Sequence, residues 1–235
     1  MTGIVKSYKG RNAIDRSDMK IRKGDIYGFI GENGAGKTTV IRLICGLITQ
    51  TEGSYELFGV KDTDKNIHLQ RKRIGAIVEA VSLIPNMNAE RNLIAHMKLV
   101  GLKDKNRIPE ILNLVGLGYL LNDNKKAKQF SLGMKQRLGL AVALLHNPEF
   151  LILDEPTNGL DPRGIIELRE LILKLNRENG ITFLISSHNL DELSKIASCY
   201  GFITRGKIVR EIEAGALTVE NSLEKTYMNI TGGAI

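Results

Sequence analysis

The chain has 235 residues and a formal net charge of +7, from 33 Lys and Arg against 26 Asp and Glu. This length allows one large α/β domain, or such a core with an inserted subdomain. No apolar run approaches the roughly 20 residues of a membrane-spanning helix, and the start lacks the apolar segment of a secretion signal, so we expect a cytosolic protein. The basic residues are scattered and aromatic residues make up only 5%, which predicts solvated charged faces and no nucleic-acid partner.

The first part of the chain predicts a strand near residues 13–21 and then a phosphate-binding loop. The apolar run from Asp25 to Ile30 is typical of a buried strand, and a helix is expected from Lys37 to Cys45. Between them, Gly31 to Thr38 fits the pattern G-x-x-x-x-G-K-[ST]. We expect a nucleoside triphosphate to be bound by the loop and the residue after it: Gly31, Glu32, Asn33, Gly34, Ala35, Gly36, Lys37, Thr38 and Thr39.

The physical reason for this expectation lies in the loop backbone. Glycine lets the chain adopt torsions that a side chain forbids and lets it approach a ligand closely. The N–H groups at the helix start then form a cradle for an anion. Lys37 is expected to reach the β- and γ-phosphates, and the Thr38 hydroxyl to ligate Mg²⁺. A glycine-rich turn before a helix is the alternative, which the strand–loop–helix context disfavours.

The rest of the chain alternates strand-like and helical stretches. This alternation predicts a mostly parallel sheet covered by helices, with a helical insertion in the middle. The two cysteines, Cys45 and Cys199, lack metal-ligand spacing and are expected to be buried free thiols. The predicted strands are 54–58, 74–78, 150–153, 182–186, 200–204 and 207–212, and the predicted helical regions are 89–146, 162–179 and 189–197.

Two adjacent carboxylates end the predicted strand at 150–153. The carboxyl ends of parallel strands line the ligand crevice of such a sheet. We therefore expect Asp154 to hold Mg²⁺, and Glu155 to accept a proton from the water that attacks the γ-phosphate. An exposed acidic turn is the alternative interpretation.

Four further segments resemble motifs of the ATP-binding cassette (ABC) ATPases. Phe130 to Arg137 resembles their LSGGQ signature, and Pro156 to Asp161 resembles their D-loop. His188, in Ser-Ser-His after a predicted strand, resembles the switch histidine that senses the γ-phosphate. Tyr8 resembles the aromatic residue that stacks on adenine. The match follows the family's order through essentially the whole chain.

The resemblance implies a P-loop NTPase core with a mostly parallel sheet, an N-terminal antiparallel β part and an inserted helical subdomain. Residues 1–235 are expected to form a single ABC ATPase domain, with a nucleotide-binding core at 1–79 and 147–235 and a helical subdomain at 80–146. The implied activity is ATP hydrolysis, with ATP and Mg²⁺ as cofactors.

The signature segment predicts a partner. Ser131 and Gly133 lie at the start of a predicted helix, which is an anion-binding position, but on the inserted part, from which they are not expected to reach their own phosphate loop. The family's solution is a head-to-tail pair of cassettes. We therefore expect a homodimer with ATP at the interface, to which Ser131, Gly133 and Asp161 contribute.

Departures from the family pattern indicate a branch. The family carries Gln where this chain has Glu79, and a carboxylate could still contact Mg²⁺. Glu79, the segment Ile84 to Leu93 and Ser131 to Met134 together resemble the ATPases of bacitracin- and lantibiotic-type exporters. These ATPases drive separate membrane-spanning permease subunits from the inner face of the cell membrane and give resistance. Only Gly3 to Val5 remain for the family's first strand, which puts the adenine pocket in question.

The exporter interpretation has competitors. Exposed apolar residues near Ser82, Leu83 and Ile84 favour a docking surface for membrane subunits. A soluble ABC ATPase acting in translation or DNA repair is the alternative, but such proteins usually carry a second cassette, a coiled coil or a zinc insertion, and none is recognisable here. A P-loop GTPase or small-molecule kinase is disfavoured by the signature helix and the lack of an N-K-x-D motif.

Overall fold

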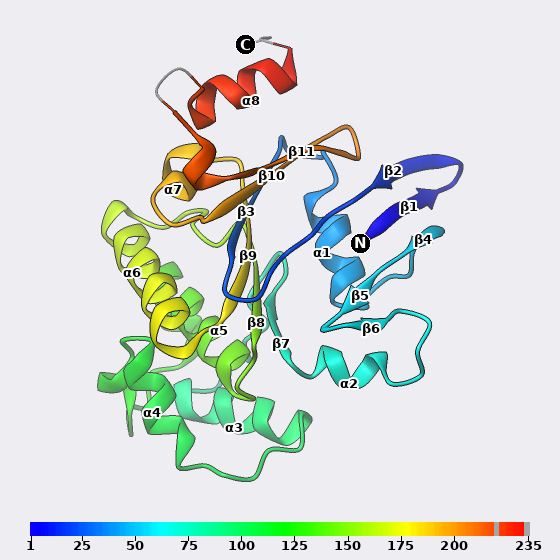
Figure 1. The fold of residues 1–235 in the computed structure, drawn as a ribbon. Coiled ribbons are helices and arrows are strands. Elements are labelled where there is room, and N and C mark those ends of the chain that lie inside the picture. Colours follow the sequence, from blue (N-terminus) through cyan, green and yellow to red (C-terminus); the bar gives the residue numbers. More distant parts are fainter. Residues whose placement is uncertain (219–220, 233–235) are drawn as a thin grey trace.

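A computed structural model of the chain describes residues 1–218 and 221–232. Figure 1 shows a twisted central sheet with the helices α3 to α6 on one side and α1, α2 and the smaller sheets on the other. Within the described residues, no helix combines the length and apolar character needed to cross a membrane.

The central sheet has six strands in the order β11–β10–β3–β9–β8–β7. The strands from β10 to β7 run parallel, and β11 pairs antiparallel at one edge. Strands β3, β8 and β9 are buried along their whole length, which is why they read as continuous apolar runs. The bounds are β3 (Ile26–Ile30), β7 (Ile74–Ile77), β8 (Phe150–Asp154), β9 (Thr182–Ser187), β10 (Cys199–Thr204) and β11 (Lys207–Glu213).

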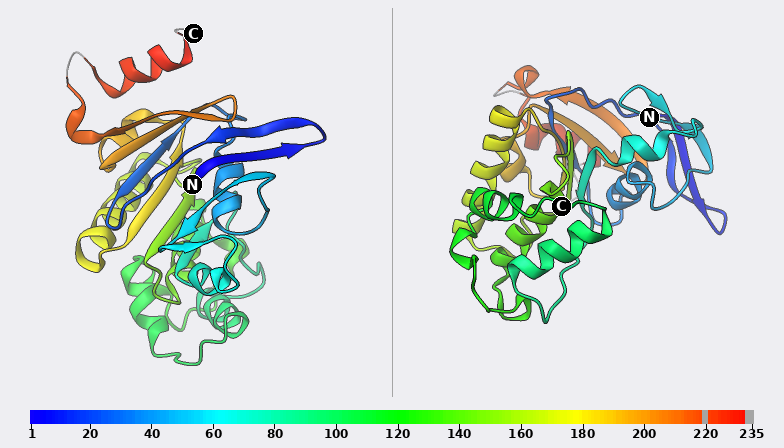
Figure 2. Two further views of the ribbon diagram at one scale, coloured as in Figure 1. Left: turned by 45° about the vertical axis from the view of Figure 1, so that its right-hand side comes forward. Right: turned by 90° about the horizontal axis from the view of Figure 1, so that it is seen from below.

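An antiparallel sheet, β2–β1–β4, and a short hairpin, β5–β6, lie beside the central sheet (Figure 2). The prediction of a first strand limited to residues 3–5 was wrong, because pairing with β2 extends β1 as far as Tyr8. The strand predicted at 13–21 ends at Ser17, and the one predicted at 54–58 is divided between two sheets. The bounds are β1 (Thr2–Tyr8), β2 (Arg11–Ser17), β4 (Glu52–Ser54), β5 (Glu56–Leu57) and β6 (Val60–Lys61).

The helices follow the sequence signals closely. Helix α6 begins after the N-cap Asp161 with Pro162 in its first turn, and it ends at Gly180, which has φ 65°. Helix α7 stops at Ser194, short of the predicted residue 197, and the chain continues as a turn in which Ile196 and Ala197 donate their N–H groups to Leu193 O. The bounds are α1 (Lys37–Ile44), α2 (Ile67–Arg71), α3 (Ala89–Leu99), α4 (Arg107–Leu114), η1 (Gly118–Leu120), η2 (Ala127–Gln129), α5 (Leu132–Leu144), α6 (Pro162–Asn179), α7 (Leu190–Ser194), η3 (Ala214–Ala216) and α8 (Leu223–Thr231).

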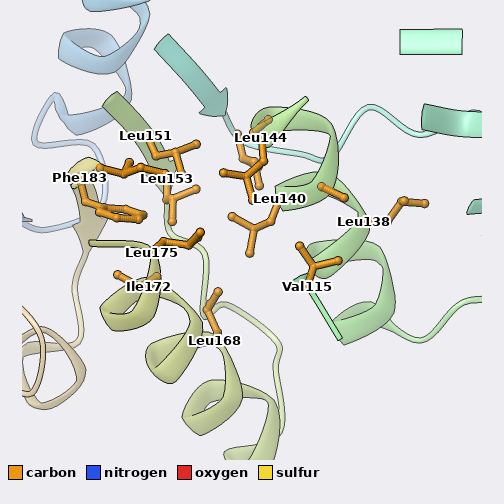
Figure 3. Close-up of a cluster of buried hydrophobic side chains, with 14 of the residues drawn as sticks. Val115, Leu138, Leu140, Leu144, Leu151, Leu153, Leu168, Ile172, Leu175 and Phe183 are labelled. Atoms are coloured by element: carbon orange, nitrogen blue, oxygen red, sulfur yellow. The ribbon is translucent and has the colours of Figure 1, made fainter. Parts of the chain in front are cut away.

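Apolar side chains fill both faces of the central sheet. On one face, α5 and α6 pack leucines onto β8, with Leu138, Leu151 and Leu153 fully buried (Figure 3). Each such side chain contributes about 1.5–3 kcal/mol on burial. The same cluster includes residues of α3 and α4, so residues 80–146 share their core with the rest of the chain. Of the two free thiols, Cys199 is buried, whereas Cys45, which caps the surface end of α1, is only partly buried.

Candidate active site

The candidate site lies at the carboxyl edge of the central sheet. Strand β9 lies between β3 and β8, with Ile30 opposite Ser187 and Asp154 opposite Ser186. The segments that leave these strands are the phosphate loop after β3, Glu155 after β8 and His188 after β9. The strand order therefore gathers residues from three distant parts of the sequence at one edge.

The phosphate loop requires glycine at two positions. Gly36 has φ 115°, and a Cβ added there would lie 2.7 Å from Ile14 Cδ1. A Cβ on Gly31 would lie 2.5 Å from the Ile203 carbonyl oxygen. These contacts, together with the left-handed torsion at Gly36, exclude a side chain, so the loop closes against β2 and β10 while its N–H groups stay available at the start of α1.

Lys37 is the first residue of α1, and its side chain folds back over the loop. Only 5% of the residue is exposed. Its Nζ donates to Gly31 O at 2.5 Å and to Glu32 O at 3.3 Å, and it lies 3.2 Å from Glu155 Oε1. The ammonium is therefore held between the loop and the carboxylate that the sequence marked as a catalytic base.

Asp154 is held by hydroxyl groups from two other elements. Thr38 Oγ1 donates to Asp154 Oδ2 at 2.9 Å, and Ser186 Oγ donates to Oδ1 at 2.5 Å. Ser186 Oγ also accepts the Glu155 N–H at 2.9 Å. Ser186 was noted in the sequence only as part of the Ser-Ser-His segment, and these contacts were not predicted. They form because Ser186 lies opposite Asp154 in the register of β8 and β9.

Glu155 has a left-handed backbone, with φ 48°, and a side chain of which 17% is exposed. Oε2 lies 2.9 Å from His188 Nδ1. The other oxygen, Oε1, is buried and has no hydrogen-bond partner, although Lys37 lies nearby. The carboxylate is thus paired with Lys37 through Oε1 and with His188 through Oε2, and its remaining lone pairs can accept a hydrogen bond from water.

A cavity of about 500 Å³ opens beside these groups. Glu79 stands on its wall with φ 61°, and its Oε1 forms an ion pair with Arg42 Nη2. Arg42 was not recognised in the sequence. The residues that line the cavity come from α1, the loop after β7, α5, the end of β8 and the segment after it: Thr38, Glu79, Ala80, Val81, Leu132, Lys135, Gln136, Asp154, Glu155 and Asn158.

The signature and D-loop residues lie on the surface. Ser131 is exposed and caps α5 by accepting the Met134 N–H at 3.2 Å. Asp161 is also exposed and accepts the Gly164 N–H at 2.9 Å. Gly133 lies near Leu160 of the D-loop segment: a Cβ added to Gly133 would be 3.8 Å from Leu160 Cδ2. Neither Ser131 nor Gly133 lines the cavity beside its own phosphate loop.

Tyr8 ends β1 and is 45% exposed. Lys6 Nζ lies 5.0 Å from its ring centroid, within the range of a cation–π contact. One face of an exposed ring at this position is thus engaged by a side chain of the same strand.

Oxygen atoms dominate the groups that could hold a cation. The described residues contain no cluster of three or more His, Cys, Asp or Glu able to bind a metal alone. Mg²⁺ normally takes one or two protein oxygens and completes its shell with phosphates and water. The Thr38 hydroxyl and Asp154 carboxylate, 2.9 Å apart, fit that mode of binding.

This combination of a glycine-built phosphate loop, a buried aspartate and a partly buried glutamate defines a P-loop nucleoside triphosphatase. Residues 14–158 match the family model described as ABC transporter. The chain therefore belongs to the ABC transporter ATP-binding family, and it is an ATPase.

Relatives named for antibiotic transport are similar to the chain over most of its length. The chain is 47% identical to the bacitracin transport ATP-binding protein BcrA of Bacillus licheniformis, over 94% of this chain and 71% of that protein. It is 44% identical to the lantibiotic transport ATP-binding protein SrtF of Streptococcus pyogenes, over 96% of this chain and 94% of that protein.

Solved structures agree with the fold. An ATP-binding subunit of an ABC transporter superposes with a TM-score of 0.84 at 26% identity, covering 98% of each chain. A dimeric, post-hydrolysis ATP-binding cassette bound to ADP and Pi superposes with a TM-score of 0.79 at 26% identity, covering 91% of this chain and 97% of that one. The predicted fold class is confirmed.

Proposed function

We propose that this chain is the ATP-hydrolysing subunit of an ABC exporter for peptide antibiotics of the bacitracin or lantibiotic type, giving resistance or immunity. The observation that carries the proposal is its similarity, over nearly its whole length, to relatives named for bacitracin and lantibiotic transport. Glu79 in place of the family's usual glutamine, and its position on the cavity wall, support the same branch.

ATP would bind along the phosphate loop, with its phosphates on the N–H groups from Gly31 to Thr39 and on the Lys37 ammonium. Tyr8 would stack on adenine through the ring face that Lys6 leaves open. When bound, Mg²⁺ would neutralise phosphate charge. The oxygens proposed to hold it are those of Thr38 and Asp154, whereas Glu79, which the sequence suggested as a further contact, is paired with Arg42 on the cavity wall.

Hydrolysis is a transfer of the γ-phosphoryl group to water. The water oxygen bonds to the γ-phosphorus, the bond from that phosphorus to the bridging oxygen of ADP breaks, and the water proton passes to Glu155. We assign this proton to the Glu155 carboxylate, whose Oε1 pairs with Lys37 and whose Oε2 contacts His188 in the structure. As the switch residue, His188 would keep the carboxylate in place and contact the γ-phosphate. Its contact with Glu155 Oε2 supports this role.

The composite site would need a second copy of this chain. Ser131, Gly133 and Asp161 are solvent-accessible and lie outside the chain's own cavity. In a head-to-tail homodimer they would close over ATP held by the partner's phosphate loop, with α5 presenting its N-terminus to the γ-phosphate.

Permease subunits would dock on the loop that precedes α3. Asn92 is fully buried, and its side chain ties this loop together, accepting the Ile84 N–H at 2.7 Å and donating to Ile84 O, Met87 O and Asn88 O. Ile84 is 37% exposed on the loop so formed, beside Ser82 and Leu83. The protein would thus act at the inner face of the cell membrane, with residues 80–146 as the helical subdomain and 1–79 and 147–235 as the core.

The decisive experiment places a photo-crosslinking amino acid at Ile84 in cells of the source organism. We expect crosslinks to small polytopic membrane proteins. Position 228 in α8 is the matched control, because Met228 has the same 37% exposure but lies outside the proposed docking loop. Crosslinks to ribosomal proteins or to DNA-bound proteins instead would favour the alternative of a soluble ABC ATPase in translation or DNA repair.

A further inference from the structure

Arg42 links the helix of the phosphate loop to the loop after β7. It lies four residues beyond Thr38 on α1, so both side chains leave the same face of the helix. Its Nη2 forms the ion pair with Glu79 Oε1. No nucleotide-binding motif of the chain includes this arginine.

Glu79 occupies a strained backbone position. Its φ of 61° lies in the left-handed region, and Ala80 donates its N–H to Val78 O at 2.7 Å across it. This is a γ-turn with a positive central φ, the rarer and more strained form. Such conformations persist where their surroundings hold them, and they gather at functional sites. The ion pair ties the Glu79 side chain to α1.

The electrostatics of the cavity give the ion pair a purpose. Glu79, Asp154 and Glu155 all line it, and a triphosphate entering it is itself polyanionic. Each carboxylate has a partner on α1: Lys37 for Glu155, Thr38 for Asp154 and Arg42 for Glu79. One helix therefore supplies a partner to each of these acidic side chains, and two of the partners, Lys37 and Arg42, are cationic.

We propose that Arg42 is a positioning residue of the ATP site. It neutralises Glu79 and holds the carboxylate at the wall of the cavity, where an uncompensated charge repels the phosphates. This inference rests on the proposed role of the cavity in binding ATP. Glu79 thus needs Arg42, whereas a glutamine at position 79 does not.

The test is charge compensation between the two residues. ATP affinity is measured by titration with a fluorescent ATP analogue at fixed Mg²⁺, on the full chain carrying Glu155→Gln to prevent turnover. We expect Arg42→Gln to weaken binding about 3- to 10-fold through the unscreened carboxylate. Glu79→Gln alone leaves binding within about twofold or tightens it. The double variant returns to within about twofold of the parent, because the repelling charge is gone.

Two further variants separate this role from a structural one. Arg42→Lys keeps the charge and is expected to bind ATP within about threefold of the parent. Arg73→Gln is the matched control, because the Arg73–Glu149 ion pair has similar side-chain exposure, 37% and 46% against 39% and 56%, at the opposite edge of the sheet. It should leave ATP affinity unchanged. Hydrogen exchange over residues 78–83 should rise in Arg42→Gln.

The outcomes are distinct. If the double variant binds ATP as weakly as Arg42→Gln, Arg42 has only a structural role, and the proposal that it compensates the charge of Glu79 is refuted. If Arg73→Gln weakens binding as much as Arg42→Gln, general loss of positive charge explains the effect and the inference is again refuted. If the parent itself does not bind ATP, the proposed function fails and this inference fails with it.

Discussion

His188 Nδ1 lies 2.9 Å from Glu155 Oε2 although 33 positions separate the two residues in the chain. Adjacent parallel strands bring them together, since β8 ends before Glu155 and β9 ends before His188. On the other side, Lys37 Nζ lies 3.2 Å from Oε1. The glutamate is thus oriented from both sides at the mouth of the phosphate loop.

Glu155→Gln should lower the ATP turnover rate by about 10²- to 10⁴-fold, because an amide cannot accept the proton of the attacking water. ATP binding and ATP-dependent dimerisation should persist. Phosphate release and nucleotide titration measure the two effects. Glu149→Gln, at the opposite edge of the sheet, is the control. If Glu155→Gln hydrolyses ATP at the wild-type rate, Glu155 is not the general base.

His188→Ala should lower the turnover rate less than Glu155→Gln. The lost hydrogen bond involves a charged group and is worth about 1.5–3 kcal/mol, which corresponds to about 10- to 150-fold in rate. The ATP dissociation constant should change little. His68→Ala, at an exposed position on α2, should turn over ATP normally. Equal rates for the two histidine variants would contradict the role of His188.

Lys37→Ala should weaken ATP binding about 10- to 100-fold, because charge-assisted hydrogen bonds to phosphate are lost. Isothermal titration with ATP measures the change. Lys174→Ala removes an exposed ammonium that pairs with Glu178 on α6 and should bind ATP as the wild type does. An unchanged titration for Lys37→Ala would remove the lysine from the phosphate site.

Gly133→Ala should distinguish an effect on folding from an effect on dimerisation. An added Cβ meets only Leu160 Cδ2, at 3.8 Å, and Ala has a higher helix propensity than Gly. The melting temperature should therefore be equal or higher. ATP-dependent dimerisation, measured by analytical ultracentrifugation in the Glu155→Gln background, should be lost because the methyl group stands where the partner's phosphates are expected. Normal dimerisation would show that Gly133 faces no partner.

The two thiols should resist alkylation in the folded protein. Burial raises the pKa of Cys45 and of Cys199 to about 12, whereas a thiol in the unfolded chain has a pKa of about 8.5. Labelling by a thiol reagent at pH 8 should be at least about 100-fold slower in native buffer than in guanidinium, because the thiolate is the nucleophile. Rapid native labelling would contradict the raised pKa values.

The same pKa shifts predict a loss of stability in alkali. Between pH 9 and 12 the unfolded chain releases the thiol protons while the folded chain keeps them, so the unfolded state binds fewer protons and the free energy of unfolding falls as pH rises. Denaturant unfolding at pH 8 and pH 10 measures this. The double variant Cys45→Ser/Cys199→Ser should show a shallower decline.

Local pattern alone was enough for much of the fold. Helix α6 starts at Pro162 and ends at Asn179 as predicted, because N-cap, proline and glycine signals act within a few residues. The buried strands β3, β8 and β9 were equally readable as apolar runs. Strand ends in the N-terminal sheet were not, since pairing with β2 and β4 decides where β1 and its neighbours stop.

The sequence by itself was enough to predict which residues carry phosphate and proton chemistry: the loop from Gly31 to Thr38, the carboxylates Asp154 and Glu155, and a histidine after the next strand. These follow from residue type and order, which the family motifs record. Only the tertiary structure decided how they are held, because their partners are set by strand register and helix orientation. Ser186 on β9 donates a hydrogen bond to Asp154 on β8. Arg42 on α1 pairs with Glu79, which lies 37 positions later in the chain. No spacing rule along the chain encodes either contact.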